Sequence, residues 1–229
     1  QQKVRQGMDM AVNKPAIIQA VYQDAGQLAV NAMPPTQWSY DDTLRDQPYD
    51  PEKAKALLKQ AGVKKGTEIT LWAMPVQRPY NPNAKLMAEM LQADWSKLGF
   101  KVRIVSYEWG EYLKRMKSGE HDIALIGWTG DNGDRDNWRG TLYSCGAIGS
   151  NNYSLWCDQQ YDQLVQQAKQ VTDREQRSAL YQQAQQRLKQ QVPITPVAHS
   201  TVNQPISAKV HDFKVSPFGR NAFSGVSVD

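Results

Sequence analysis

Two short segments of the chain combine charged side chains with aromatic and turn-forming residues, and each follows an apolar run. Residues 77–83 contain Gln-Arg-Pro-Tyr and a single charge, Arg78, whereas residues 127–138 contain Trp-Thr-Gly-Asp, in which Asp131 is the first acid. A guanidinium can bind a carboxylate through two parallel hydrogen bonds, and an aspartate can bind an ammonium group. Such a pair suits a small ligand that carries both charges, for example a short peptide.

The elements around these segments predict an α/β fold in which both segments leave the same edge of a sheet. Strand-like and helix-like patterns alternate over residues 68–74, 83–98, 102–107, 109–117 and 123–128. This alternation favours a mostly parallel sheet flanked by helices, with right-handed crossovers. Ligands of open α/β sheets bind beyond the carboxyl ends of the strands, where both segments lie.

The sequence before the first strand predicts three helices and one irregular segment. Helices are expected over residues 2–13 and from Pro15 to Tyr22, and residues 25–49 are expected to be irregular. The third helix begins at Asp50, because aspartate is a favoured N-cap and proline follows it in the first turn. Gly62 is expected to end that helix.

The sequence after the last strand predicts a polar loop, a helix pair and an extended tail. Residues 129–157 form the loop, in which Asp134 is expected to cap a short helix through Trp138. Helices are expected over 158–170 and 173–191, the second with a capping box of Thr172 and Glu175. A strand is expected over 194–198, and residues 201–229 contain too little apolar sequence to bury a core of their own.

The bulk composition is that of a water-soluble globule. The chain has 229 residues, 40% of them hydrophobic and 22% charged, with a formal net charge of +4. No apolar run is long enough to cross a bilayer, so we expect no membrane insertion. The basic residues are interspersed with acids, which argues against a nucleic-acid-binding surface. The chain lacks an initiator methionine and opens within a predicted helix, so we expect it to be a piece of a longer protein.

Motifs for metal, cofactor or catalytic chemistry are missing from the sequence. The acids that follow Asp131 do not have calcium-loop spacing, and the three histidines, His121, His199 and His211, lie far apart. There is no nucleophile elbow, phosphate-binding glycine loop or dinucleotide fingerprint, so no cofactor is predicted. A carboxylate pair that meets only in space would escape this test, so a peptidase-type enzyme stays as the alternative to a binding protein.

Several of these residues have a plain structural alternative. Arg78 could be an ordinary surface arginine, although the surrounding prolines stiffen its loop and would reduce the entropy lost on binding. Asp131 could form a turn, and Trp128 could close the end of the sheet instead of lining a pocket. Cys145 and Cys157 could brace the polar loop as a disulfide, as in exported proteins, or be two free thiols.

The two charged segments resemble those of bacterial extracellular solute-binding protein family 5, the periplasmic binding components of peptide, nickel and haem importers. The resemblance is strongest to the dipeptide branch and extends over nearly the whole chain. It rests on strings at residues 4–6, 11–14, 49–54, 71–84, 107–115, 127–134 and 198–202.

The resemblance implies a type II periplasmic-binding-protein fold with two lobes that close around a peptide. Residues 1–200 would form most of the second, ligand-binding lobe, and residues 201–229 would return to complete the first lobe, whose main body is absent. Arg78 would hold the peptide carboxylate and Asp131 its α-amino group. Tyr80, Trp128 and Gly130 lie in the same two strings and are predicted as further ligand contacts.

The resemblance also implies a cellular setting and a set of partners. The protein would be a periplasmic monomer that is not an enzyme and that delivers dipeptides or short peptides to the membrane permease of an ABC transporter. Cys145 and Cys157 would form a disulfide in this oxidising compartment. Arg135 replaces a proline of the family string, and relatives with similar strings bind other solutes. Glutathione, haem and antimicrobial peptides are therefore alternative ligands.

Overall fold

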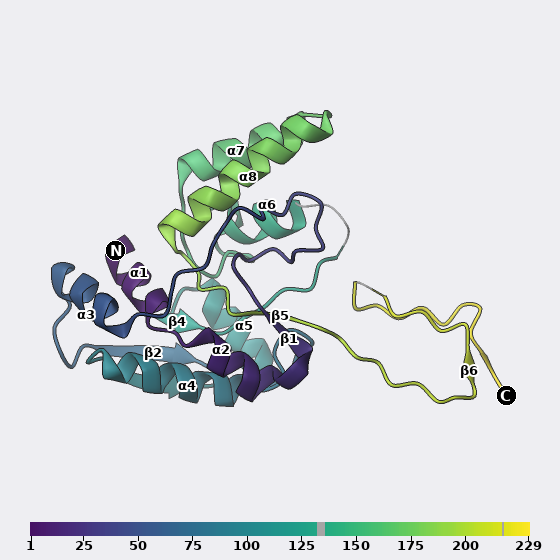
Figure 1. The fold of residues 1–229 in the computed structure, drawn as a ribbon, viewed down its shortest axis with the longest axis horizontal. Helices are drawn as coiled ribbons and strands as arrows, with labels where there is room; N and C mark the ends of the chain where they lie inside the picture. Colours follow the sequence, from purple (N-terminus) through teal and green to yellow (C-terminus); the bar gives the residue numbers. More distant parts are fainter. Residues whose placement is uncertain (132–135, 217) are drawn as a thin grey trace.

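A parallel sheet of three strands carries the two charged segments (Figure 1). The computed structural model describes residues 1–131, 136–216 and 218–229. The strand order is β3-β2-β4, and β2 pairs in parallel with both neighbours. The strands are β2 (Glu68–Trp72), β3 (Lys101–Val105) and β4 (Ile123–Ala124). The predicted parallel α/β arrangement is therefore confirmed, although β4 is shorter than the expected 123–128.

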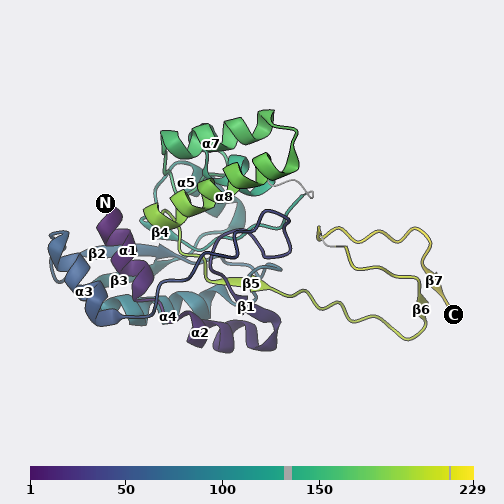
Figure 2. The same ribbon diagram turned by 45° about the horizontal axis from the view of Figure 1, so that its top comes forward.

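Two helices make the crossovers between these strands, as the sequence predicts. They are α4 (Ala84–Lys97) and α5 (Trp109–Lys117). Asn83 caps α4 by accepting a hydrogen bond from the Leu86 amide at 3.0 Å. Met87, Leu91 and Trp95 form part of the buried face of α4, which runs along the sheet (Figure 2).

The N-terminal helices pack around the same core. They are α1 (Gln2–Met10), α2 (Lys14–Ile17), which continues as the π-helix η1 (Ile18–Tyr22) and the short 3₁₀-helix η2 (Gln23–Ala25), and α3 (Pro51–Gln60). The predicted Asp50 cap is confirmed, because its carboxylate accepts from the Lys53 amide at 2.9 Å. Gly7 allows α1 to approach α3 closely, since an added Cβ would lie 3.2 Å from the Ala54 carbonyl oxygen.

Two predictions about strands are wrong. Residues 25–49 are not wholly irregular, because β1 (Gly26–Leu28) pairs antiparallel with β5 (Ala198–Ser200). The strand expected over 194–198 instead begins at Ala198. Pro193 and Pro196 have no amide hydrogen to donate to a ladder, so regular pairing starts only after them.

The helical part beyond the sheet consists of α6, η3, α7 and α8, and the last two pack side by side (Figure 2). Their bounds are α6 (Asp136–Tyr143), η3 (Cys145–Ala147), α7 (Gln159–Gln170) and α8 (Arg174–Gln191). The predicted capping box at Thr172 is wrong, since Asp173 caps α8 through the Gln176 amide at 2.9 Å. The Asp173 carboxylate, one residue after Thr172, accepts the hydrogen bond at the start of the helix instead of the Thr172 hydroxyl. The expected cap at Asp134 lies outside the described residues.

A segment without helices, residues 29–49, crosses α8 and is called here the strap. Gln185 of α8 is buried and binds Asn31, the Ser39 carbonyl and the Asp41 amide, at 2.9, 2.8 and 3.1 Å respectively. Asp46 accepts hydrogen bonds from two lysines, Lys14 and Lys189. These polar contacts fasten the strap between α2 and α8.

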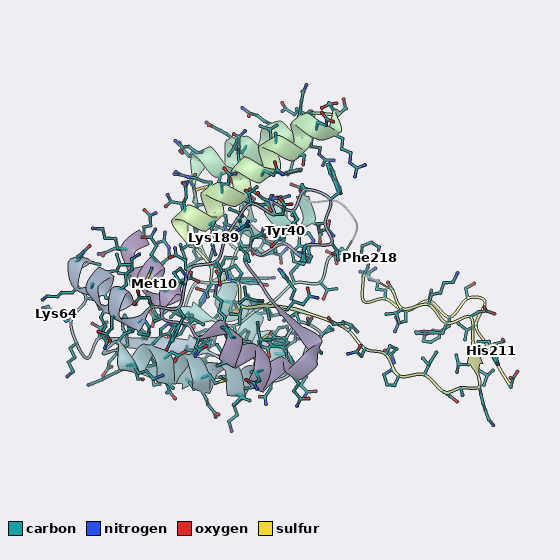
Figure 3. All side chains as sticks on the ribbon, in the orientation of Figure 1. Met10, Tyr40, Lys64, Lys189, His211 and Phe218 are labelled. Carbon is teal, nitrogen blue, oxygen red and sulfur yellow. A yellow bond between two sulfur atoms is a disulfide. The ribbon has the colours of Figure 1, made fainter. Side chains whose placement is uncertain are left out.

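The C-terminal tail extends away from the rest of the molecule (Figures 1 and 2). Its only regular pairing among the described residues joins β6 (Val210–His211) to β7 (Ser227–Val228). Figure 3 shows His211 and Phe218 on this extended segment. Phe223 and Val228 are 69% and 68% exposed, so the tail leaves apolar side chains in water.

Candidate functional site

The loops that follow β2, β3 and β4 meet at the carboxyl edge of the sheet, where the sequence placed the site. Tyr112 of α5 holds this edge together. It is fully buried, and its hydroxyl lies 3.1 Å from the Trp72 carbonyl oxygen and 2.7 Å from that of Leu125. These two carbonyls belong to the ends of adjacent strands, so one side chain fixes both loops that carry the predicted charges.

Arg78 lies in a tight turn after β2. Its backbone exchanges two hydrogen bonds with Asn81, at 3.0 and 2.9 Å, and the buried Asn81 side chain accepts from the Asn83 amide at 3.0 Å. The guanidinium lies over the Trp109 indole, with Cζ 4.3 Å from the ring centroid. The Arg78 side chain makes no ion pair within the described ranges, and its role as a ligand contact stays a prediction.

Tyr80 joins the first charged segment to the second. Its ring lies against Gly127, where an added Cβ would come within 2.1 Å of a ring carbon, so only glycine fits there. Its carbonyl accepts a hydrogen bond from the Tyr22 hydroxyl at 2.8 Å. Burial raises the pKa of Tyr80, and the nearby Arg78 charge opposes that rise. Residues 77–83 therefore contact the beginning of residues 127–138 directly.

Asp131 is exposed, and Asn137 holds it on two sides. The Asn137 amide group donates to Asp131 Oδ2 at 3.0 Å, while its Oδ1 accepts from the Asp131 backbone N–H at 3.0 Å. The same Oδ1 accepts from the Trp128 indole N–H at 2.9 Å. Asp131 Oδ1 takes no hydrogen bond from any residue in the described part of the chain. The following residues 132–135, including Arg135, lie outside the described ranges.

Trp128 and Gly130 lie on the same loop as Asp131. Both are half-buried, and Trp128 packs against a small cluster formed by Met33, Trp138 and Leu142. The indole of Trp128 thus contacts the strap and α6. Its role as a ligand contact, like those of Tyr80 and Gly130, stays a prediction.

Sequence reasoning did not single out Asn137 or Trp109. Asn137 lies within the second charged segment, but only the fold brings its side chain back to Asp131. Trp109 follows β3, so its place at the start of an element after a strand was a usable signal.

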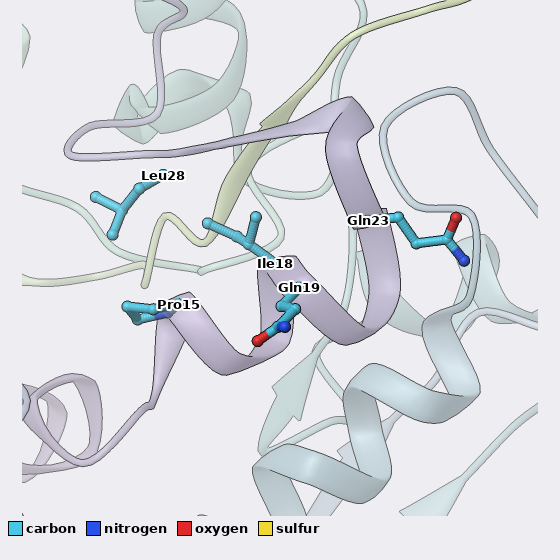
Figure 4. Close-up of a pocket in the computed structure, with 5 residues that line it drawn as sticks. All are labelled: Pro15, Ile18, Gln19, Gln23 and Leu28. Carbon is cyan, nitrogen blue, oxygen red and sulfur yellow. The ribbon is translucent and has the colours of Figure 1, made fainter.

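A hollow of about 540 Å³ lies beside α2 and β1, away from the five predicted residues (Figure 4). It is open to solvent, and none of those five lines it. Its walls are Pro15, Ile18, Gln19, Gln23 and Leu28. The charges that the sequence emphasised therefore belong to the open carboxyl edge and not to this hollow.

The histidines lie in separate surroundings. His121 Nε2 is 2.9 Å from the Tyr153 carbonyl oxygen, and burial lowers its pKa. Burial lowers the pKa of His199 to about 4. His211 pairs with Asp229 in the tail. Among the described residues, no group of three histidine, cysteine or acidic side chains could hold a metal ion, and no helix could span a membrane.

The two cysteines form a disulfide, with sulfur atoms 2.09 Å apart. This confirms the pairing and excludes the interpretation as two free thiols. The Cys145 amide donates to the Asp162 carboxylate at 3.0 Å, and the enclosed Asn152 is buried. The bridge therefore closes a loop that is organised mainly by polar contacts.

Comparison with known proteins gives consistent results. Residues 1–150 match the family model described as bacterial extracellular solute-binding proteins, family 5 middle. Over 99% of its length the chain is 71% identical to di/tripeptide-binding protein 3 of Pseudomonas aeruginosa and 49% identical to heme-binding protein A of Haemophilus influenzae. The chain covers only 43% and 42% of these two relatives.

A solved structure shows the same fold. The dipeptide-binding protein of Pseudoalteromonas sp. SM9913, in complex with Met-Leu, superposes on 100% of this chain with a TM-score of 0.90 at 36% identity. This chain covers 45% of that structure.

Proposed function

Since this chain belongs to the family 5 bacterial extracellular solute-binding proteins, we propose that it is the ligand-binding part of the substrate-binding component of an importer. That component would capture dipeptides or short peptides. The observation that carries this proposal is that Arg78, which pairs with no acid among the described residues, and the exposed carboxylate of Asp131 follow adjacent strands and lie on loops at one sheet edge. The 71% identity to a di/tripeptide-binding protein supports the same ligand class.

In the proposed mode of binding, Arg78 holds the peptide carboxylate and Asp131 the α-ammonium group. Two extended residues span roughly 7 Å, so two charges fixed near that separation would select by length and not by side chain. Tyr80, Trp128 and Gly130 would line the space between them. Binding of this kind would tolerate many different peptide side chains.

The proposed architecture places residues 1–200 in the second lobe of a two-lobed protein. Residues 201–229 would return to the first lobe, which explains why this tail exposes residues such as Phe223 and Val228. The chain spans less than half of its relatives, so the first lobe would lie in the remaining sequence. Closure of the two lobes would trap the peptide and signal to an ABC permease in the membrane.

The proposal includes a setting and excludes catalysis. The protein would act in the periplasm as a monomer, where the disulfide is stable, and would release its peptide unchanged. Incubation of peptides with the protein, followed by mass spectrometry, tests this point. New peptide termini that disappear in an Asp131→Ala variant would favour a peptidase instead.

Calorimetry of the full-length protein with di-, tri- and tetrapeptides tests the binding function. Arg78→Ala and Asp131→Ala should each weaken dipeptide binding by more than about 1 kcal/mol, because each removes a charge-assisted hydrogen bond. The exposed residues Arg103 and Asp42 supply matched controls, Arg103→Ala and Asp42→Ala, which should bind like the parent. An unchanged affinity in either test variant would remove that residue from the site.

Haem is the second candidate ligand, since the chain is 49% identical to heme-binding protein A. A thermal-shift series with dialanine, glutathione and haem separates the two. The peptide proposal expects stabilisation by dialanine. Stabilisation by haem or glutathione, with none by dialanine, would replace the proposed ligand.

A further inference from the structure

The Arg78 guanidinium is supported by an aromatic ring and, among the described residues, by no carboxylate. Its Cζ atom lies 4.3 Å from the centre of the Trp109 indole. In the described ranges no acid pairs with it, and its Nε is buried without a hydrogen-bond partner. The negative face of an indole attracts a cation, and this attraction grows as water is excluded. The contact with Trp109 therefore holds the charge in place while its terminal nitrogens stay available.

Trp109 is itself fixed by the core. It begins α5, immediately beyond β3 and its short connecting loop, and its ring stacks on Tyr112 with centroids 5.7 Å apart and planes 16° apart. Tyr112 is fully buried and bonded to carbonyls at the ends of β2 and β4. A continuous set of contacts thus links the guanidinium to the strands that define the site.

The carboxylates nearest to Trp109 in sequence are engaged elsewhere. Glu108 caps α5, accepting from the amides of Gly110 at 2.8 Å and Glu111 at 3.2 Å. Glu111 pairs with Arg115 at 2.6 Å. Neither acid neutralises Arg78, so among the described residues the cation at the sheet edge has no carboxylate partner.

We propose that Trp109 is the positioning residue for Arg78 and takes the place of a protein counter-ion. The inference rests on the proposed function, in which Arg78 receives a ligand carboxylate. A protein carboxylate in this position would compete with the ligand for the guanidinium donors and would repel its charge. A neutral ring orients the planar cation without using any of its N–H groups, which pre-organises it for a bidentate contact.

A double-mutant cycle in the full-length protein tests the inference. Trp109→Leu should weaken dialanine binding about 3- to 30-fold, the range of a partly buried cation–π contact. In an Arg78→Ala background the same change should alter affinity less than about twofold. Trp109→Phe keeps a smaller ring and should retain part of the affinity. Trp38→Leu is the matched control, because Trp38 also supports an arginine, Arg174, at 4.7 Å.

Equal losses from Trp109→Leu in both backgrounds would overturn the inference, since they would mean that the indole contacts the peptide itself. If instead Arg78→Ala leaves binding unchanged, the proposed function fails. The contact between Trp109 and Arg78 is then tested without ligand, from the melting temperatures of the parent, Trp109→Leu, Arg78→Ala and the double variant. Coupling predicts that the double variant loses less than the sum of the single losses, whereas additive losses would refute the pairing.

Discussion

Asn137→Ala provides a direct test of how the Asp131 loop is held. The change removes three hydrogen bonds, which involve the Trp128 indole, the Asp131 amide and the Asp131 carboxylate, at 2.9, 3.0 and 3.0 Å. A typical protein hydrogen bond contributes about 1 kcal/mol net. Water can replace the two bonds to the exposed Asp131, whereas the half-buried indole N–H is harder to satisfy. We therefore expect a loss of about 1–2 kcal/mol in the free energy of unfolding.

The same variant should weaken dipeptide binding about 3- to 10-fold, because the Asp131 carboxylate loses the amide that orients it. Denaturant unfolding measures the first effect and calorimetry of the full-length protein measures the second. Gln166→Ala, an exposed amide on α7, is the matched control and should change stability by less than about 0.5 kcal/mol. If Asn137→Ala unfolds and binds like the parent protein, the Asp131 loop does not depend on the three hydrogen bonds of Asn137.

Three further predictions concern stability. Asp46→Asn should cost about 1.5–3 kcal/mol in denaturant unfolding, because the buried Lys14 ammonium loses its partner at 2.7 Å and keeps only the Asp9 carboxylate at 3.6 Å. Lys55→Ala, in an exposed pair, should cost about 0–1 kcal/mol, and similar costs for both would contradict this reasoning. His199 has a folded pKa of about 4, below the ordinary 6.5, so its contribution of about 3 kcal/mol to the free energy of unfolding is complete above pH 6.5 and is lost as the pH falls toward 4. His199→Gln should flatten the pH dependence of stability between these values, and an unchanged slope would refute this prediction. Replacing Cys145 and Cys157 together by serine should cost roughly 3 kcal/mol, and an unchanged melting curve in non-reducing buffer would contradict a bracing role.

The predictions of local structure that held depend on signals confined to a few neighbouring residues. The Asp50 cap, the α4 and α5 crossovers and the parallel strands followed from short-range patterns that the backbone obeys directly. The errors have two causes. The Asp173 cap depended on competition between two adjacent acceptors, and the β1–β5 pairing depended on a partner far away in the chain.

The sequence alone determined that Arg78 and Asp131 follow strands whose carboxyl ends lie at one edge of the sheet, because parallel strands all end at the same edge. The tertiary structure decided that these two strands, β2 and β4, are neighbours. It could not determine what holds each charge. Trp109 beneath the guanidinium, and Asn137 across the aspartate, reach their partners through packing of α5 and through a loop that turns back on itself. Contacts of this kind depend on side-chain orientation in three dimensions, which residue type and spacing along the chain do not specify.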